Sequence, residues 1–222
     1  MQPSSPVLRL RARGPFACFT RPELKVERVS YPVMTPSAAR GAIEAVLWKP
    51  AIAWRIHRIH VLSEIRFTAF RRNEVNSRAA KPSLAMVANG GSLDPFFADE
   101  QENRAQRNTV ALRDVDYLIE ASFQMTRRAG PSDNVQKFVE TFERRLRNGQ
   151  HFHQPYLGCR EFIAEMLPAD AAPPAVDDSR DLGLMLWDIV FRPGGNRAVF
   201  FDAKLEHGVL SVPESPDGKE SG

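Results

Sequence analysis

The 222-residue sequence has little of several features that mark particular classes of protein. Its two cysteines, Cys18 and Cys159, are too few for a disulfide framework and indicate buried free thiols. No run of about 18 apolar residues occurs, and the N-terminal MQPSSPVLRLRARG has no apolar segment behind its charges. These absences exclude a disulfide-rich secreted domain and a membrane-spanning helix, and we expect a cytoplasmic protein.

Histidines are also few, at five, and they do not follow a metal-binding pattern. The densest stretch, HFHQPYLGC, gathers His151, His153 and Cys159, but this spacing fits no familiar zinc motif. His57 and His60 are three apart on an expected strand, so without a bulge they point to opposite faces. We therefore expect no metal site.

Positive charge is concentrated in the N-terminal part of the chain, although the net charge of the whole is +3. Residues 1–82 contain 15 Lys and Arg against 5 Asp and Glu, a net of +10, so residues 83–222 carry 15 against 22, a net of −7. Eleven of those 15 basic residues are arginines at or before Arg72. Such a segment indicates a polyanion partner, with a solvated basic face as the alternative.

Two segments have the pattern of amphipathic helices. In TPSAARGAIEAVLWKP (35–50), Thr35 suits the N-cap, Pro36 suits the first helical position and Pro50 is expected to stop the helix. In SDNVQKFVETFERRLRNG (132–149), a Ser/Asp cap precedes the helix and Gly149 follows it. The apolar stripes expected to be buried are Ala39, Ala42, Ile43, Val46 and Leu47 in the first helix and Val135, Phe138, Val139, Phe142 and Leu146 in the second.

Alternating sequences predict strands around these helices. VLRLRAR (7–13) places Leu8, Leu10 and Ala12 on one face and three arginines on the other. Further strands are expected at 53–62, 64–72, 115–125 and 154–162. The order of strand, helix, strands, helix and strand predicts an α+β fold with a ferredoxin-like βαββαβ domain, a frame shared by RNA-recognition modules and many unrelated enzymes.

The expected domain organisation follows from this order. We expect the ferredoxin-like domain over residues 5–167, with an irregular polar insertion at about 73–113. After a Pro/Ala/Asp linker, three strand-like runs predict a small C-terminal antiparallel β-sheet extension over 181–213. The polar residues 214–222 are expected to form a disordered tail.

Six strings occur in order along the chain: FACFTRPELKVERVSYPVMTPSAARG (16–41), WKPAI (48–52), RRNEV (71–75), VDYLIEASF (115–123), GQHFHQPYLGCREF (149–162) and DLGLMLWDIVF (181–191). Together they resemble the CRISPR-associated Cas5 family of subtype I-C, a branch of the RAMP superfamily. Because their spacing is preserved over most of the chain, the match is far more specific than a short motif.

The resemblance implies a protein that cuts the CRISPR repeat transcript at the base of each repeat hairpin. It implies that the protein then stays on the 5′ handle of the guide RNA as a subunit of the Cascade surveillance complex. The implied partners are the repeat RNA, the backbone and large subunits of Cascade and, as a further candidate, target DNA, with no membrane partner. The implied cleavage needs no metal or other cofactor, because a 2′-hydroxyl attacks the adjacent phosphodiester and the protein positions it, moves protons and neutralises charge.

The catalytic cluster of the family transfers only in part. Well-studied relatives carry a tyrosine or histidine just before WKP and a Lys-His pair early in the second helix, although other members also lack that histidine. This chain has Leu47 and then Lys137 followed by Phe138. Leu47 and Phe138 lie on the apolar stripes, so we expect them in the core. We predict Lys137, His153 and Tyr156 as catalytic residues, with His151 and Tyr31 as the other available substitutes.

The expected RNA contacts are basic residues on strand faces and in loops. For each of them a solvated or ion-paired edge is the alternative. VLRLRAR has no aromatic residue that could stack on a base, so the candidates for base stacking are Phe70, Trp48 and Tyr31. For each of them, burial in the core is the alternative. The predicted RNA-binding residues are Arg9, Arg11, Arg13, Arg21, Lys25, Arg28, Arg40, Lys49, Arg71, Arg72 and Arg160.

Two other functions stay open. The first is a structural Cascade subunit that binds the 5′ handle without cutting it, which the residues at positions 47 and 138 favour. The second is a metal hydrolase that uses HFHQPYLGC, for which a chelator would abolish activity.

Overall fold

The computed structural model describes residues 3–76, 80–93, 97, 100, 103–192 and 195–215, so most of the tail expected from 214 lies outside the described residues. The strands are β1 (Leu8–Ala17), β2 (Arg28–Val29), β3 (Ile52–Val61), β4 (Arg66–Val75), β5 (Arg104–Met125), β6 (Glu165–Pro168), β7 (Arg180–Arg192), β8 (Gly195–Glu206) and β9 (Val209–Ser211). The helices are α1 (Pro36–Val46), α2 (Leu84–Ala88) and α3 (Val135–Arg147), with 3-10 turns at Pro22–Leu24 and Ala169–Ala171.

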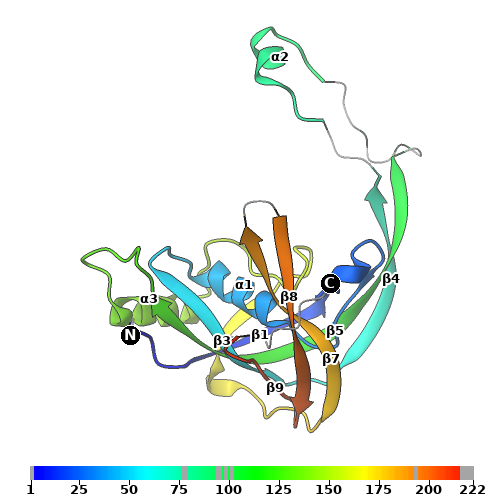
Figure 1. Ribbon diagram of the computed structural model, residues 1–222. Helices are drawn as coiled ribbons and strands as arrows, with labels where there is room; N and C mark the ends of the chain where they lie inside the picture. The colour runs from blue at the N-terminus through cyan, green and yellow to red at the C-terminus, as the bar shows by residue number, and fades with distance from the viewer. Residues whose placement is uncertain are drawn as a thin grey trace.

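These strands belong to one sheet with the order β6-β1-β5-β3-β9-β8-β7 (Figure 1). The long strand β5 is shared: one of its edges pairs with β1 and then β2, and the other pairs with β3 and then β4. The β2–β5 pairing is parallel, and the other pairings between named strands are antiparallel.

The prediction of an α+β fold with a ferredoxin-like βαββαβ domain and a C-terminal antiparallel β-sheet extension is wrong in its ferredoxin-like core. The described chain is mostly one antiparallel sheet, because β5 serves as the partner of four other strands. The C-terminal strands join the same sheet, since β9 pairs with β3 at Arg58, Ile59 and His60. Pairings between residues so far apart in the chain leave no local signal from which the true strand order could be predicted.

The strand predicted at 154–162 is also wrong, because this segment is a loop. Tyr156 makes an isolated bridge to Ile163, and β6 begins only at Glu165. The alternating burial of Pro155, Leu157 and Cys159 imitates a strand, but Gly158 has a φ of +83° and turns the chain against Cys18. A Cβ at Gly158 would lie 2.1 Å from the Cys18 carbonyl oxygen.

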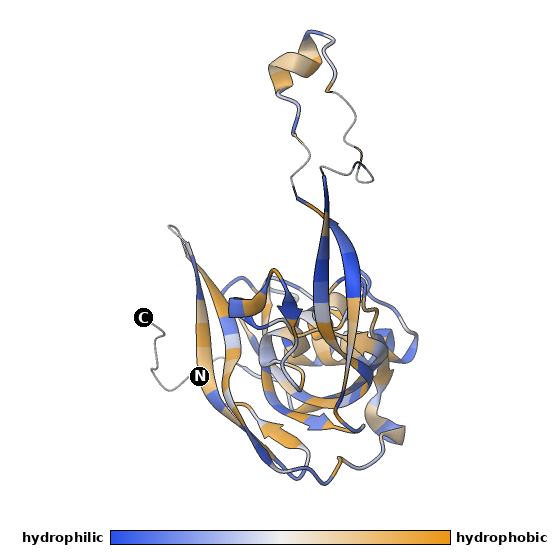
Figure 2. Cartoon of the chain, turned by 90° about the vertical axis from the view of Figure 1, so that its right-hand side faces the viewer, coloured by the Kyte–Doolittle hydropathy of each residue, from blue (hydrophilic) through white to orange (hydrophobic). Residues whose placement is uncertain are grey.

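Beyond the sheet body, β4 and the first half of β5 form a two-stranded ribbon that carries α2 at its far end (Figure 1). Residues 73–75 and 104–113, which we expected to be irregular, are therefore strand. The ribbon strands are largely hydrophilic, whereas apolar residues gather in the body (Figure 2). Phe67 is exposed, and Phe70, one of the residues considered for base stacking, packs against the rings of Phe16 and Phe162 at centroid distances of 6.2 and 6.0 Å.

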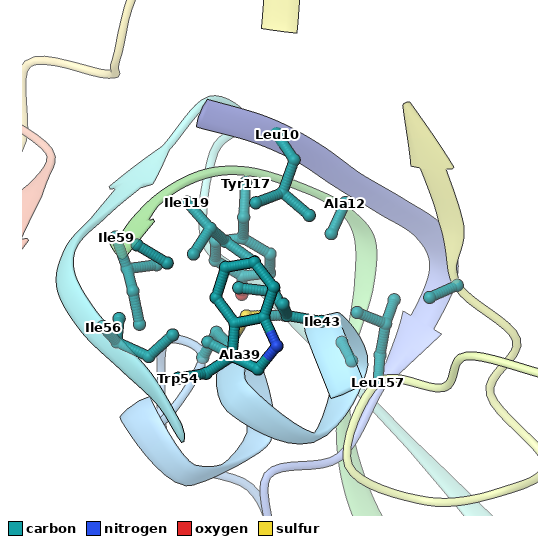
Figure 3. Packing of buried hydrophobic residues seen from close by; sticks show 14 of the residues in the cluster. Leu10, Ala12, Ala39, Ile43, Trp54, Ile56, Ile59, Tyr117, Ile119 and Leu157 are labelled. Atoms are coloured by element: carbon teal, nitrogen blue, oxygen red, sulfur yellow. The ribbon is translucent and has the colours of Figure 1, made fainter. Parts of the chain in front are cut away.

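The core forms where the curved sheet faces α1. Figure 3 shows Leu10 of β1, Ile59 of β3 and Ile119 of β5 pointing toward Ile43 of α1. The prediction of this helix is confirmed: the side chain of Thr35 caps it by accepting a hydrogen bond from the Ala38 amide at 3.3 Å, and its apolar stripe is buried.

The prediction of the second helix is confirmed in its core stripe, since Phe138, Val139, Phe142 and Leu146 of α3 are buried. Its cap differs, because Asn134 accepts the hydrogen bond from the Lys137 amide at 2.9 Å in place of the expected Ser or Asp. No helix in the described part of the chain is long and apolar enough to cross a membrane.

Candidate functional site

At the start of α3, Asp133 is paired with Lys137 and is also influenced by the charge of Lys49. Lys137, in the first turn, places Nζ 2.9 Å from Asp133 Oδ1. Hydrogen bonds from Lys137 and from the Gly130 amide lower the pKa of Asp133, and the charge of Lys49 lowers it further. Both ammonium groups are exposed. This arrangement, here called the α3 N-terminal site (Lys49, Asp133 and Lys137), leaves an excess of positive charge where the helix dipole also favours an anion.

The predicted proton-transfer residues lie in the loop after α3. His153 is exposed, with its ring 6.2 Å from the ring of Phe152, and the Phe152 amide donates to the Ala45 carbonyl at 2.7 Å. Tyr156 is half-buried at its bridge to Ile163. Among the described residues, the Lys137 ammonium lies beside Asp133, the Ser132 carbonyl and the Phe138 ring, and contacts neither side chain.

The two substitutes named from the sequence occupy different surroundings. Tyr31 is buried beneath the Arg21 guanidinium, whose Cζ lies 4.4 Å from the ring centroid, and burial raises the pKa of this phenol. His151 is exposed and lines a groove beside β6. Leu47 and Phe138 are 0% and 4% exposed, which confirms that the two positions departing from the family pattern belong to the core.

The three arginines of β1 lie on the sheet face opposite α1, and each faces a carboxylate. Arg11 pairs with Asp116 through Nε–Oδ1 and Nη2–Oδ2 contacts of 2.8 and 2.5 Å. Arg13 Nε lies 2.6 Å from Glu165, and Arg9 Nε lies 3.5 Å from Glu120. The basic face expected from VLRLRAR is therefore largely neutralised by acids from β5 and β6.

A second network lies where the ribbon meets the loop after α3. Arg72 contacts Glu161 and, at 2.9 Å, Glu74, and Arg28 approaches Glu74 at 3.5 Å. Arg28 also donates to Cys159 Sγ at 3.2 Å. Hydrogen bonds from the Cys18 thiol and from Arg28 lower the pKa of Cys159 to about 6.

The two cysteines are free and buried, as predicted. The Cys159 thiol also lies 3.6 Å from the Cys18 carbonyl oxygen. Cys159 is thus a hydrogen-bonded group of the core, and its lowered pKa favours the thiolate more than in a free cysteine.

Of the remaining residues predicted to bind RNA, some are held by other side chains of the protein and others are exposed to solvent. Arg40 is held by Asp188, with an Nη2–Oδ1 distance of 2.8 Å, and Arg21 covers Tyr31. Arg71 is exposed and makes a long contact of 3.4 Å with Gln106. Lys25, Lys49 and Arg160 are exposed. Of the aromatics considered for base stacking, Trp48 is 56% exposed beside Lys49.

The sequence did not reveal that His57 and His60 share a face. A register shift in the β3–β5 pairing between Ile56 and Arg58 turns His57, so that its Nε2 lies 2.7 Å from Ser122 Oγ. His60 Nε2 lies 3.4 Å from Glu120. Burial lowers the pKa of both imidazoles. A β-bulge has no reliable sequence signal, so this pair could not have been foreseen.

The structure also joins α3 to the end of α1 in a way that the sequence did not suggest. Arg145 Nη1 donates to the Val46 carbonyl at 2.8 Å and satisfies one of the free carbonyls at the helix end. Within the described ranges, no group of three or more His, Cys, Asp or Glu side chains is placed to hold a metal ion.

A family model described as CRISPR-associated protein (Cas_Cas5) matches residues 7–213. The chain belongs to the Cas5 family. Two Cas5 relatives are named CRISPR pre-crRNA endoribonuclease Cas5d. The relative from Mannheimia succiniciproducens is 45% identical over 213 residues, which cover 93% of this chain and 94% of the relative. The relative from Thermus thermophilus is 42% identical over 224 residues, which cover 93% and 91%. The resemblance noted from the six sequence strings is confirmed.

Solved structures similar to this Cas5 chain have the same fold at low sequence identity. A functionally uncharacterized protein from Streptococcus mutans, SMU1763c, has a TM-score of 0.68 and 19% identity, covering 100% of this chain and 98% of its own. A structure described as a CRISPR-associated protein has a TM-score of 0.69 and 19% identity, covering 96% and 94%. These likenesses establish the fold alone.

Proposed function

We propose that this protein is a pre-crRNA endoribonuclease, which cuts CRISPR repeat RNA without a metal ion and stays on the 5′ handle as a subunit of a type I-C Cascade complex. The observation that carries the proposal is the 45% identity, over 93% of the chain, to a relative named for this activity. The exposed lysines of the α3 N-terminal site supply the positive charge that such a reaction requires.

The reaction is an internal transesterification. A 2′-oxygen loses its proton and bonds to the neighbouring phosphorus, the bond to the 5′-oxygen breaks, and the leaving oxygen takes up a proton. The products are a 2′,3′-cyclic phosphate and a 5′-hydroxyl. Lys137 and Lys49 neutralise the charge that develops on the phosphoryl oxygens, and such electrostatic stabilisation supplies the largest single contribution in many enzymes.

Two protons must move, and the proposal assigns these steps to His153 and Tyr156. Both are exposed or half-buried in the loop that follows α3, so RNA can reach them. Their approach to Lys137 is assigned to the RNA-bound state, in which catalytic contacts often become shorter.

The test is incubation of the purified protein with its cognate repeat RNA in excess EDTA, followed by analysis of the product ends. Cleavage with a 5′-hydroxyl and a cyclic phosphate supports the proposal. A repeat RNA with a 2′-deoxynucleotide at the cut is the matched control and should stay intact. Cleavage that requires added metal, or that continues on the deoxy substrate, would contradict the mechanism.

One observation favours a second function, a structural subunit that binds the 5′ handle and does not cut. Leu47 and Phe138 are buried hydrocarbons where relatives carry proton-transfer groups. This alternative predicts salt-sensitive handle binding without turnover in the same EDTA assay. It also predicts that Lys137→Ala weakens binding, with no cleavage rate to lose.

A further inference from the structure

A groove of about 960 Å³ lies beside the edge strand β6. Its lining comes from β1, the kink in β5, the end of α3 and the loop after it, and apolar surface from Pro155, Ile163 and Met166 forms part of its walls. The volume is at the upper end of the range for small-ligand pockets, roughly 300–1,000 Å³, so the groove has room for more than a single small group.

Three polar side chains in the lining have free hydrogen-bonding capacity. Asp114, Gln150 and His151 are exposed, and none of these side chains is hydrogen-bonded or ion-paired to another residue in the described part of the chain. An ionised carboxylate only accepts hydrogen bonds, an amide both donates and accepts, and an imidazole can also stack. Convergent polar groups among apolar walls are typical of a site that orients a specific ligand.

Asp114 also has an unusual backbone. Its φ is +53°, a left-handed conformation that is uncommon for a residue other than glycine. It lies in β5 between the segment that pairs with β4, up to Arg113, and the segment that pairs with β3, from Tyr117. Local backbone strain of this kind tends to occur at binding sites, where it aims a side chain.

Charge in the groove is balanced, which distinguishes it from a phosphate track. The lining includes three arginines and three acids: Arg13, Arg145, Arg147, Asp114, Asp116 and Glu165. Arg13 is paired with Glu165 at 2.6 Å, and Arg147 is exposed with a longer contact of 3.3 Å to Glu143. A guanidinium is therefore available to a phosphate at the α3 end, while the Asp114 end suits a neutral group that donates hydrogen bonds.

We infer that the groove holds unpaired nucleotides of the repeat RNA and reads their bases, an inference that rests on the proposed function. The apolar walls receive the base faces, Gln150 and His151 contact base edges, and Arg147 contacts the backbone. Asp114 accepts from an exocyclic amino group, so adenine, cytosine or guanine is preferred over uracil, whose exocyclic groups are both acceptors.

The experiment uses the full-length protein and its cognate repeat RNA. Gln150→Trp places a bulky side chain in the groove, and Asn196→Trp, at an exposed amide on β8 outside the lining, is its matched control. His151→Ala removes one groove side chain without adding bulk. Thermal unfolding of each variant establishes that it is folded, and a 2-aminopurine substituted at each unpaired position reports which base enters the groove.

The expected result is a loss of affinity of about tenfold or more for Gln150→Trp, and less than twofold for Asn196→Trp. One 2-aminopurine position should respond in the wild type and lose its response in Gln150→Trp and His151→Ala. A uridine placed there should weaken binding to the wild type but not to Asp114→Asn.

Wild-type affinity in folded Gln150→Trp and His151→Ala, while the wild type binds and cuts the RNA, would overturn the groove inference and leave the proposed function standing. Failure of the wild type itself to bind the repeat RNA would overturn the proposed function, and the inference with it.

Discussion

The pairing of Arg11 with Asp116 predicts that this arginine stabilises the fold and does not contact RNA. Arg11→Met keeps the alkyl stem and removes the guanidinium. The side chains of Arg11 and Asp116 are 17% and 15% exposed, and Arg11 Nη1 also donates to the Ala171 carbonyl at 3.3 Å. The pair is intermediate between exposed pairs, worth up to about 1 kcal/mol, and buried pairs, whose disruption costs about 3–5 kcal/mol.

We therefore expect Arg11→Met to lower the free energy of unfolding by about 2–3 kcal/mol, or the Tm by roughly 4–12 °C for a chain of this size. The double variant with Asp116→Asn should cost less than the sum of the single changes, because each removes the same interaction. Thermal and urea unfolding measure both effects.

RNA binding as a function of salt concentration supplies the second measurement. Lys49→Ala, which removes an exposed ammonium, should reduce the slope of log affinity against log salt by about 0.7 for a single-stranded contact. Arg11→Met should leave that slope unchanged. The reasoning is refuted if Arg11→Met keeps the wild-type Tm and reduces the salt slope as much as Lys49→Ala does.

Three further predictions concern Lys137, which we propose as catalytic, and the surroundings of the cysteine pair. Lys137→Ala should reduce single-turnover cleavage of repeat RNA by about 10²-fold or more, with Lys204→Ala, on an exposed part of β8, as the unaffected control. Gly158→Ala should lower the Tm measurably, because the new Cβ would meet the Cys18 carbonyl oxygen at 2.1 Å and the φ of +83° disfavours alanine; an unchanged Tm would contradict this. Since the folded pKa of Cys159, about 6, lies below the unfolded value of about 8.5, its contribution to stability is present above pH 8.5 and is lost as pH falls through 6. Unfolding curves at several pH values should show this loss in the wild type and not in Cys159→Ala.

Features that depend on neighbours in the chain could be predicted from the sequence. The cap at Thr35 and the apolar stripe through Ile43 act within a few residues, so α1 is where its sequence indicated. The same argument placed Leu47 and Phe138 in the core, at two positions where this chain lacks the proton-transfer groups of the family pattern. Alternation in VLRLRAR likewise fixed which face of β1 is buried.

Features that depend on distant residues could not be predicted. Arg11 and Arg13 were predicted as RNA contacts, with ion pairing as the alternative, and the sequence could not decide because their partners Asp116 and Glu165 lie more than a hundred positions away. The segment 154–162 was predicted as a strand, because every second residue of this loop is buried, and buried residues alternate in the same way along a strand. The groove beside β6 unites residues from β1, β5, α3 and a loop, which the single sequence could not bring together.

The pairing of β9 with the edge of β3 affects how the protein folds during its synthesis. Residues 58–60 of β3 pair with residues 209–211, so this edge stays unpaired until the last described strand has left the ribosome. An uncovered strand edge offers free amide and carbonyl groups to other chains, and contacts so far apart in the sequence form slowly. A nascent chain ending before Val209 therefore carries an open sheet edge, and aggregation during synthesis should depend on how soon β9 arrives.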